Sequence, residues 1–406
     1  MDPLDIMLDS EKVIPYYQPI ISADTQLVSG YEVRAHFLEN ERNAQQLDWF
    51  FEDTSIPHDF HLELNNWIHA KAVKAFLMTD QSTNLFLHYD ARLLLNDNAD
   101  TLLALLYAYK EQGLDFTRII IELKEPFIKN QLDDFRPLFS YIKTLGIRIA
   151  LDDVGKKNGN LDHLAILKPN IVKVDAGFLK DDLLPHLHRD VHHSLTMLSR
   201  TIGAALLFKN ISSYNQLNYA WRNGGRYYQG AYIKRIGPDF VEPDGAKEKI
   251  KTDFQHFITF ERKKMTAQME LTNLINKQFT TTLSTITSSD PYDDIILAAA
   301  HACDRFVFRV YICNEEGIQL SSNADKNKDG EWELTHESRQ KNWSWRPYFF
   351  ENIVRMNIEK KGILSDLYTD IEKDEQIKTF SYPITDTLYI FLDVPFDYLY
   401  EQEGLL

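Results

Sequence analysis

Residues 148–154 read RIALDDV, an apolar run that ends in the adjacent aspartates Asp152 and Asp153. A loop of Gly, Lys and Asn residues, GKKNGN at 155–160, follows the pair. Acidic residues are rare inside buried strands, so the two aspartates mark the end of such a strand. Paired carboxylates in this position are a common way to hold a divalent metal ion. The stretch therefore predicts a buried strand whose end carries either working chemistry or the remains of a metal site.

Seven further apolar, β-rich runs lie between residues 16 and 235, and helical patterns separate most of them. Alternating strands and helices predict a mainly parallel sheet covered by helices, and eight strands over about 220 residues fit a TIM-like barrel. Only SADTQL (22–27) separates the first two runs, which is too short for a crossover helix, so we expect an antiparallel first pair. The predicted strands are YYQPII (16–21), VSGYEV (28–33), LFLHYD (85–90), RIIIEL (118–123), RIALDDV (148–154), IVKVD (171–175), AALLFKN (204–210) and YYQGAYI (227–233).

The ends of the predicted strands carry charged and polar side chains. In a TIM-like barrel the active site lies at the C-terminal ends of the strands, so these side chains are expected to converge there. A single acid at a strand end is readily explained as a solvated side chain, whereas five acids at strand ends on one rim are hard to explain by packing. The strand-end residues are Glu32, His88, Glu122, Asp152, Asp153, Lys173, Asp175, Lys209 and Gln229.

Size and charge limit the possible partners. With 406 residues the chain is too long for one ordinary core, so we expect two or three domains. A net charge of −16 disfavours nucleic acids and anionic membranes, because both need a basic surface. No apolar run is long enough to cross a bilayer and the N-terminus lacks a signal segment, so we expect a cytoplasmic protein. The only cysteines, Cys303 and Cys313, are expected to be buried thiols, with a disulfide as the alternative.

Two further segments follow the predicted barrel. After Gly245 the chain lacks Gly and Pro as far as Asp290, and its apolar residues recur at helical spacing, which predicts a long helix. We expect this helix either to join two domains, in which case its free surface could form a dimer interface, or to pack on the barrel. From residue 290 onwards, one helix, short strands and the polar loop NADKNKDGEW (323–332) predict an antiparallel α+β module. The predicted division is a barrel at 1–240, a connecting helix at 241–289 and a sensor-like module at 290–406.

The motifs of the barrel resemble, in order and spacing, those of the EAL domain family. They are YYQPI, GYEVRAHF, LFLHYD, IIIELKE, LDDVGKKNGN, ILKPNIVKVD and GGRYYQGAYI. The resemblance covers about residues 12 to 240. It implies a TIM-like barrel of a kind whose active members hydrolyse cyclic di-GMP to linear pGpG with two divalent metals. With the helix and the last module, the chain resembles EAL proteins in which a PAS-like domain follows the barrel.

The resemblance implies roles for individual residues. The implied metal ligands are Glu32, His88, Glu122 and Asp152, with His88 in place of a metal-binding Asn. The implied catalytic positions are Lys173, Asp153 and Asp175, and Glu125 matches an acid that supports the catalytic loop. Gln18 and Gln229 match contacts to the ligand.

The chain departs from the family pattern where two acids are expected. Lys209 and Ser212 occupy those positions. At ~4 Å and an effective dielectric constant near 20, each pair of unit charges interacts by about 4 kcal/mol, so an ammonium group at Lys209 repels a second metal. It would instead pair with Asp153 or Asp175. We therefore expect a degenerate, inactive site that retains a single divalent ion (Mn²⁺, Mg²⁺ or Zn²⁺), or in which His88 simply hydrogen-bonds to the acids.

Binding of cyclic di-GMP is left open by the sequence. His36 replaces the Arg that usually contacts a phosphate group, and it is shorter and mostly neutral at pH 7. Arg34, Lys156 and Lys157 offer substitute charges, and Arg34 lies on the same side of its strand as Glu32.

The last module carries a second candidate site. The segments NWSWRPYFF (342–350) and GILSDLYTD (362–370) resemble the ligand-binding half of PAS-like and Cache sensor domains. The implied pocket for an unknown small polar molecule consists of Trp343, Arg346, Tyr348, Asp366, Tyr368 and Asp370. Alternatively, the aromatic residues form the core of the module and Arg346 pairs with Asp366.

These observations favour a signalling protein with a degenerate EAL barrel and a PAS-like sensor domain. We expect it to act as a cyclic di-GMP receptor or regulatory partner and to form a homodimer. One rival interpretation is a cyclic di-GMP phosphodiesterase with altered metal use. Another is a structural scaffold that binds a ligand only in its last domain.

Overall fold

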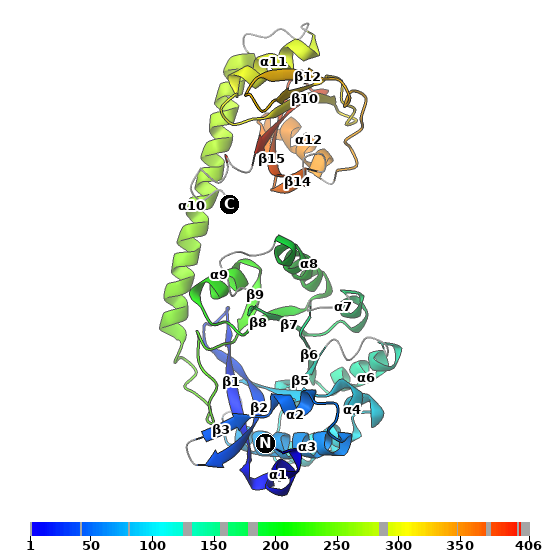
Figure 1. The fold of residues 1–406 in the computed structure, drawn as a ribbon, viewed down its shortest axis with the longest axis vertical. Coiled ribbons are helices and arrows are strands. Elements are labelled where there is room, and N and C mark those ends of the chain that lie inside the picture. The colour runs from blue at the N-terminus through cyan, green and yellow to red at the C-terminus, as the bar shows by residue number, and fades with distance from the viewer. Residues whose placement is uncertain are drawn as a thin grey trace. The chain divides into compact units, whose positions relative to one another are not determined.

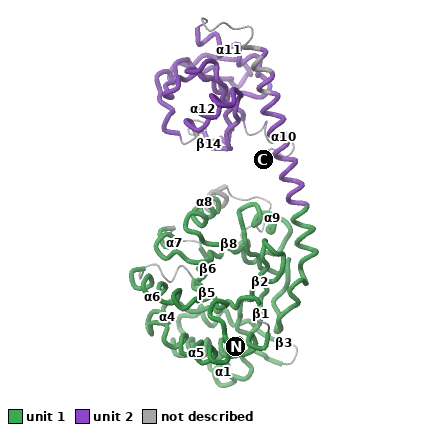
Figure 2. The backbone as a smooth tube through the Cα atoms, turned by 180° about the vertical axis from the view of Figure 1, so that it is seen from behind, with its two compact units in different colours: residues 1–255 green, residues 256–406 purple. Residues whose placement is uncertain are grey.

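The structure is a computed structural model that describes residues 2–40, 43–79, 82–124, 132–154, 161–177, 186–283, 291–346, 348–370, 375–395 and 398. The chain forms two compact units, residues 1–255 and 256–406 (Figure 2). The division expected from the sequence stays a prediction, namely separate domains at 1–240, 241–289 and 290–406.

The first unit contains a closed barrel of eight strands with helices around its outside (Figure 1). The strand order is β1-β9-β8-β7-β6-β5-β4-β2, and the pairing of β1 with β2 closes the ring. Strand β1 is antiparallel to both of its neighbours, and the other neighbouring pairs of the ring are parallel. The TIM-like fold and its antiparallel first pair are therefore confirmed. The strands are β1 (Val13–Ser22), β2 (Val28–Asn40), β3 (Asn43–Gln46, which extends the sheet beyond β2), β4 (Asn84–Tyr89), β5 (Ile119–Lys124), β6 (Arg148–Asp152), β7 (Ile171–Asp175), β8 (Ala205–Lys209) and β9 (Gly225–Tyr228).

Amphipathic helices cover the barrel because their apolar residues recur at helical spacing. In α6, for example, Phe135, Leu138, Phe139 and Ile142 form the buried face. The helices of this unit are α1 (Pro3–Leu8), α2 (Asp48–Glu52), α3 (His58–Leu77), α4 (Ala91–Asn96), α5 (Asp100–Lys110), α6 (Leu132–Thr144), α7 (Leu161–Leu167), α8 (His186–Ile202) and α9 (Tyr214–Arg222), with 3₁₀ turns at Ser10–Lys12 and Phe116–Arg118.

An apolar layer fills the barrel beneath its C-terminal mouth. It consists of Ile20, Phe86, Ile120, Ala150, Ile171 and Leu207. Each member stands two positions from a polar residue named from the sequence, for example Ile120 from Glu122 and Ile171 from Lys173. Because side chains alternate along a strand, residues two apart point to the same face. The polar side chains therefore form the next layer, on top of an apolar floor.

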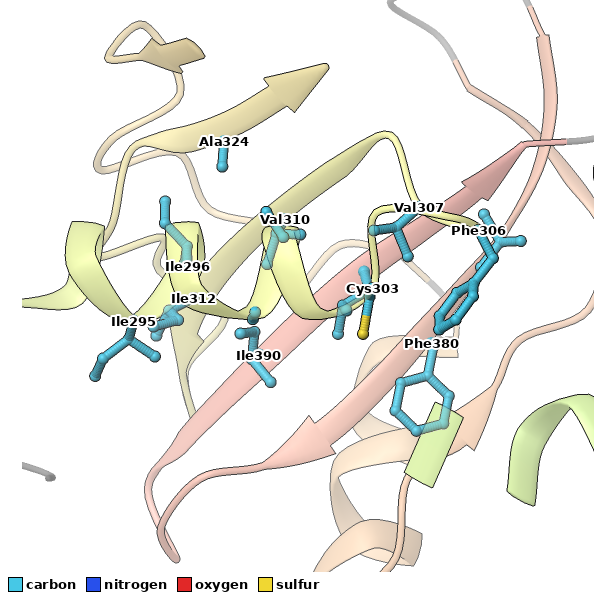
Figure 3. Packing of buried hydrophobic residues seen from close by; sticks show 14 of the residues in the cluster. Ile295, Ile296, Cys303, Phe306, Val307, Val310, Ile312, Ala324, Phe380 and Ile390 are labelled. Carbon is cyan, nitrogen blue, oxygen red and sulfur yellow. The ribbon is translucent and has the colours of Figure 1, made fainter. Parts of the chain in front are cut away.

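The second unit is an antiparallel sheet with a helix on each face. Its strand order is β12-β11-β10-β16-β15-β13, and β14 also pairs with β15. Figure 3 shows Ile295, Ile296 and Cys303 gathered with Val310, Ile312 and Ile390 between α11 and the sheet. The alternate residues Tyr311 and Cys313 pack with α12 on the other face. The elements are α11 (Tyr292–Ala302), β10 (Arg309–Asn314), β11 (Asn323–Lys326), β12 (Trp332–Thr335), α12 (Tyr348–Glu359), β13 (Ile363–Leu364), β14 (Tyr368–Asp370), β15 (Glu375–Pro383) and β16 (Leu388–Pro395).

The predicted polar loop at 323–332 is too long, because only residues 327–331 lie outside strands. Strands β11 and β12 form an antiparallel hairpin there. The Asn327 side chain accepts hydrogen bonds from the backbone of Asp329 and Glu331, and Gly330 has a φ of +85°. The many polar residues suggested a loop, but on one face of a half-exposed hairpin they are compatible with a strand.

A long helix, α10 (Lys247–Leu283), begins in the first unit and ends in the second. In the first unit Phe254 packs against the rings of Trp221 and Tyr228. In the second unit Leu271 belongs to the apolar cluster beneath α11. None of the helices formed by the described residues combines the length and hydropathy that a membrane span requires. Cys303 and Cys313 are buried free thiols, as predicted.

We predict that Gly230→Ala destabilises the first unit. Gly230 follows Gln229 with a φ of +149°, and an added Cβ would clash with the backbone of Ile211. The unfolding free energy measured by urea denaturation should fall by about 2–3 kcal/mol. Gly237→Ala is the matched control because open space surrounds its Cβ position. Equal stability of the two variants would contradict the steric explanation.

Candidate functional site

Polar side chains from several strand ends meet at the mouth of the barrel. Register places Gln18 opposite Glu32, His88 beside Glu122, and Asp175 beside Lys209. Relative exposures are 0% for Glu32, Glu122 and Lys173, 1% for Asp152, 5% for Lys209 and 4% for Gln229. Burying this many charges is tolerable only if they neutralise one another.

Lys173 lies between two carboxylates. Its Nζ donates to Glu32 Oε2 at 2.7 Å and to Glu122 Oε2 at 2.6 Å. Gln229 Nε2 also donates to Glu32 Oε2, at 2.5 Å. The guanidinium group of Arg34 pairs with the other oxygen of Glu32 and lies 3.0 Å from Asp48 Oδ2. Glu32 is therefore held by two cations and an amide.

The two acids around Lys173 are not equivalent. Burial raises the pKa of Glu32, but Arg34 and Lys173 outweigh this effect and bring that pKa down to about 2. Burial and the neighbouring charge of Glu32 raise the pKa of Glu122 to about 8. At neutral pH Glu32 is therefore ionised, and Glu122 retains a proton in a large fraction of molecules.

Lys209 forms a second cluster with the aspartate pair. Its Nζ lies 2.6 Å from Asp152 Oδ2 and 2.8 Å from Asp153 Oδ1. Although burial opposes ionisation, Lys173 and Lys209 hold the pKa of Asp152 well below its usual value, and the two aspartates hold the pKa of Lys209 above its usual value. The other partner considered from the sequence, Asp175, accepts hydrogen bonds from the backbone of Gly177 and from Asn210.

The turn after β6 positions Asp153. Asp153 adopts a left-handed conformation with a φ of 58°, and its backbone N–H donates to Asp152 Oδ1 at 2.8 Å. Aspartate tolerates this conformation better than most residues because its short side chain bonds locally. Both carboxylates consequently face the same ammonium group, although they are adjacent in the chain.

His88 is a neutral imidazole at pH 7. Burial and the nearby cations Arg34 and Lys124 lower the pKa of His88 to about 4. Its Nδ1 is buried and has no hydrogen-bond partner within the described ranges. That nitrogen therefore offers no support for the alternative in which His88 simply bonds to the acids.

The donor atoms fit one divalent ion better than two. Among the residues that the structure describes, no group of three His, Cys, Asp or Glu side chains has the spacing of a preformed metal site. Glu32, Glu122 and Asp152 nevertheless present oxygens at neighbouring strand ends, and Glu122 Oε1 is buried without a hydrogen-bond partner in the described part. Such oxygens suit a hard divalent cation. The Lys209 ammonium group already pairs with Asp152 and Asp153, and its positive charge opposes a second cation at these two carboxylates.

The remaining barrel residues lie around this centre. Gln18 Nε2 donates to the carbonyl of Lys234 at 2.9 Å. His36 is buried and stacks on Tyr16, with ring centroids 4.0 Å apart. Ser212 donates to Gln216. Glu125, Lys156 and Lys157 lie outside the described residues.

In the second unit the structure brings together part of the predicted pocket. The Arg346 guanidinium carbon lies 4.3 Å from the ring centre of Trp343, and Arg346 donates to the Tyr368 hydroxyl at 3.4 Å. Asp370 is buried against Arg309 at 2.8 Å, and Asp366 is exposed. The side chain of Tyr348 lies outside the described part. Whether these residues bind a small molecule stays a prediction.

The sequence did not identify Asp48 or Arg309 as members of charged clusters. Asp48 is on the short helix α2 and reaches Arg34, and Arg309 gathers Asp325, Asp370 and Asp393. Periodicity indicates which side of an element is buried but does not reveal which distant side chain completes an ion pair. The sequence signal for Arg309 was its place as a charged residue inside the apolar run FVFRVYIC (306–313).

Comparison with known proteins identifies relatives over the whole length. The family described as EAL domain matches residues 2–235, and the family described as EAL-domain associated signalling protein domain matches residues 240–406. The uncharacterized EAL-domain containing protein YkuI of Bacillus subtilis (strain 168) is 42% identical over 410 residues, covering all of both chains. Its crystal structure in complex with substrate c-di-GMP and calcium matches with a TM-score of 0.94 and 41% identity over both complete chains. The c-di-GMP complex of the PaMucR phosphodiesterase shares the fold, with a TM-score of 0.51 and 17% identity over 59% of this chain and 98% of that one.

We predict that Lys209→Met destabilises the protein much more than Lys124→Met. Both lysines have a carboxylate oxygen at 2.6 Å, but the Lys209 pair is 7% and 2% exposed, whereas the Lys124 pair is 19% and 60% exposed. Removing one partner of a buried pair costs about 3–5 kcal/mol, and removing a surface partner costs up to about 1 kcal/mol. Urea unfolding at pH 7 measures both variants. Similar losses would show that burial does not govern the contribution of Lys209.

A pH-dependent stability difference is expected for Glu122→Gln. The pKa of Glu122 is about 8 in the folded protein, above the value of about 4.3 of an unfolded chain. The unfolded state therefore releases this proton first, and the stability of the wild type falls as pH rises from about 4 to 8. The glutamine variant lacks this loss. Its stability relative to the wild type should increase by more than about 1.4 kcal/mol, one pKa unit, between pH 5 and pH 8.

Chemical denaturation across this pH range tests the Glu122 prediction. The surface variant Glu52→Gln is the control, since Glu52 is 60% exposed. Parallel stability curves for the wild type and Glu122→Gln would show that Glu122 is ionised like an ordinary carboxylate.

Proposed function

This chain belongs to the EAL domain family, which is related to cyclic di-GMP phosphodiesterases, and we propose that its barrel binds cyclic di-GMP as a receptor or regulatory partner without hydrolysing it efficiently. The observation that carries this proposal is the ion pairing of Lys209 with Asp152 and Asp153. At this position an ammonium group pairs with the carboxylates that a second metal ion would need as ligands.

Several groups at the barrel mouth support binding of a ligand with two phosphates. YkuI, which shares 42% of its residues with this chain, has been crystallised with c-di-GMP and calcium. Arg34 is 20% exposed at the mouth, and a guanidinium group there suits a phosphate oxygen. Gln18 and Gln229 offer amides at the same rim. These groups position a ligand without requiring that it react.

A single divalent ion fits this proposal. Glu32, Glu122 and Asp152 would hold it with oxygen atoms, and the imidazole of His88 would favour Mn²⁺ or Zn²⁺ over Mg²⁺. Such an ion would supply positive charge next to a phosphate group of the ligand. For the carboxylates to accept it, the contacts of Lys173 with Glu32 and Glu122 and the contact of Lys209 with Asp152 have to rearrange.

The proposed loss of hydrolysis follows from proton transfer as well as from charge. Hydrolysis of a phosphodiester needs a group that accepts a proton from the attacking water. The aspartates around Lys209 raise its pKa, so it remains an ammonium ion and accepts no proton. Ser212 offers no carboxylate either. The chain therefore has neither of the two acids that the family pattern places here.

The second unit completes the proposed signalling role. We propose that it is a PAS-like sensor domain and that the chain acts as a homodimer. The stacking of Arg346 on Trp343 beside Tyr368 supports a site for a small polar molecule, since a guanidinium group held in this way suits a carboxylate.

Isothermal titration of the full chain with cyclic di-GMP, with and without Mn²⁺, tests the barrel proposal. We expect stoichiometric binding and, by chromatography, no steady accumulation of pGpG. Arg34→Gln should weaken binding about 10- to 100-fold, since charge-assisted hydrogen bonds contribute about 1.5–3 kcal/mol. Arg226→Gln is the matched control, because Arg226 pairs with Asp24 on the surface.

Other results would favour the rival interpretations. Multiple turnovers to pGpG that disappear in Asp152→Asn would support a phosphodiesterase with altered metal use. A titration without heat of binding under both conditions would favour the third interpretation, a structural scaffold that binds a ligand only in its second unit.

A further inference from the structure

A small cavity lies in the wall of the barrel behind His88. Its volume is about 20 Å³. One buried water molecule needs roughly 10–15 Å³ measured in this way, so the cavity has room for one water molecule. The polar residues that line it are Arg34, Asp48, Asn65, His69 and His88.

Helix α3 turns an unusual polar stripe toward the interior. His61, Asn65 and His69 occupy successive turns and are only 1%, 3% and 2% exposed. Buried polar side chains in native proteins almost always have hydrogen-bond partners, either protein groups or ordered water. Two of the three, Asn65 and His69, line the cavity.

Three buried nitrogen atoms around this cavity have no protein partner. They are Asn65 Nδ2, His69 Nδ1 and His88 Nδ1, and none has a hydrogen bond within the described parts of the chain. The other side of the His69 ring bonds to the backbone of His88. The His69 ring is only 2% exposed and has no carboxylate beside it among the described residues, so it is neutral, and its single N–H is used in that bond. Its Nδ1 is therefore a hydrogen-bond acceptor.

We propose that the cavity binds one water molecule, which fixes the tautomer of His88. The water accepts hydrogen bonds from Asn65 Nδ2 and from His88 Nδ1–H, and it donates one to His69 Nδ1. Its second hydrogen atom goes to the carboxylate of Asp48. All four hydrogen-bonding positions of the water are used in this arrangement. His88 then carries its proton on Nδ1 and keeps a lone pair on Nε2.

This tautomer prepares His88 to act as a ligand. An imidazole that binds a metal ion through one nitrogen usually donates the N–H of the other to a fixed partner. Asn65 and His69 are then positioning residues that act on the barrel mouth through the water. The tautomer itself is a property of the metal-free protein, and only its consequence for metal affinity rests on the proposed function.

Two-bond ¹H–¹⁵N correlation spectra of metal-free, full-length protein test the tautomer. We expect His88 to be a single Nδ1–H tautomer in the wild type. In Asn65→Leu and His69→Phe the water loses a donor or an acceptor, and His88 should become a mixture of tautomers. His69→Gln, whose amide oxygen accepts a hydrogen bond, should restore the single form.

The matched control is His61→Phe, which removes an equally buried histidine of the same helix that does not line the cavity. It should leave the His88 signals in the wild-type tautomer. An Nε2–H tautomer in the wild type, or an unchanged His88 tautomer in both Asn65→Leu and His69→Phe, would overturn the proposal.

Titration with Co²⁺, followed by its visible absorption, separates this inference from the proposed metal site. His69→Phe should weaken Co²⁺ binding about 10- to 100-fold, as expected when a ligand loses its supporting partner, and His61→Phe should not change it. If His88→Ala abolishes binding and His69→Phe has no effect, the positioning role is wrong while the metal site stands. If His88→Ala binds Co²⁺ like the wild type, the claim that His88 is a metal ligand is wrong. The ¹H–¹⁵N correlation spectra then decide whether the claim about the tautomer holds.

Discussion

Two buried ammonium groups hold the mouth of the barrel together. Lys173 on β7 joins Glu32 on β2 to Glu122 on β5, and Lys209 on β8 holds Asp152 at the end of β6. These contacts link five of the eight strand ends through ion pairs and hydrogen bonds that are almost completely removed from water. An unpaired charge at such depth is very unfavourable, so each group depends on its partners being in place.

The ion pairs depend in turn on strand register. The apolar floor of the barrel and the charged layer above it are made by residues two positions apart on the same strands. A shift of one residue would turn both layers outward together, which exposes the floor and buries the outer side chains. Packing and electrostatics consequently specify the same register, and the charged centre tolerates burial because the layer beneath it positions it.

The order and direction of the barrel strands could be predicted from the sequence, because apolar runs, helical spacing and one short connection express them locally. The strand-end residues were also identifiable, since acids such as Glu122 are conspicuous at the end of a buried strand. Their pairing was not, because whether Lys209 meets Asp153 or Asp175 depends on side-chain geometry between strands. Asp48 and the stripe of Asn65 and His69 carried no signal, since a polar residue at an apolar position of a helix looks like an exposed one. The hairpin at 323–335 was missed for the opposite reason, because its polar composition imitates a loop.

The antiparallel first strand has a consequence for how the barrel forms. Strand β1 pairs with β9 through Ile21 and Tyr228, and the backbone of Tyr17 bonds to Gly237, so partners more than 200 residues apart close the ring. Contacts of such high sequence separation slow folding because a long loop has to close first. During synthesis β1 has only β2 beside it until the last strand leaves the ribosome, and its other edge stays open meanwhile. Completion of the barrel therefore waits until β9 has been synthesised, and before that it depends on an edge strand escaping incorrect pairing.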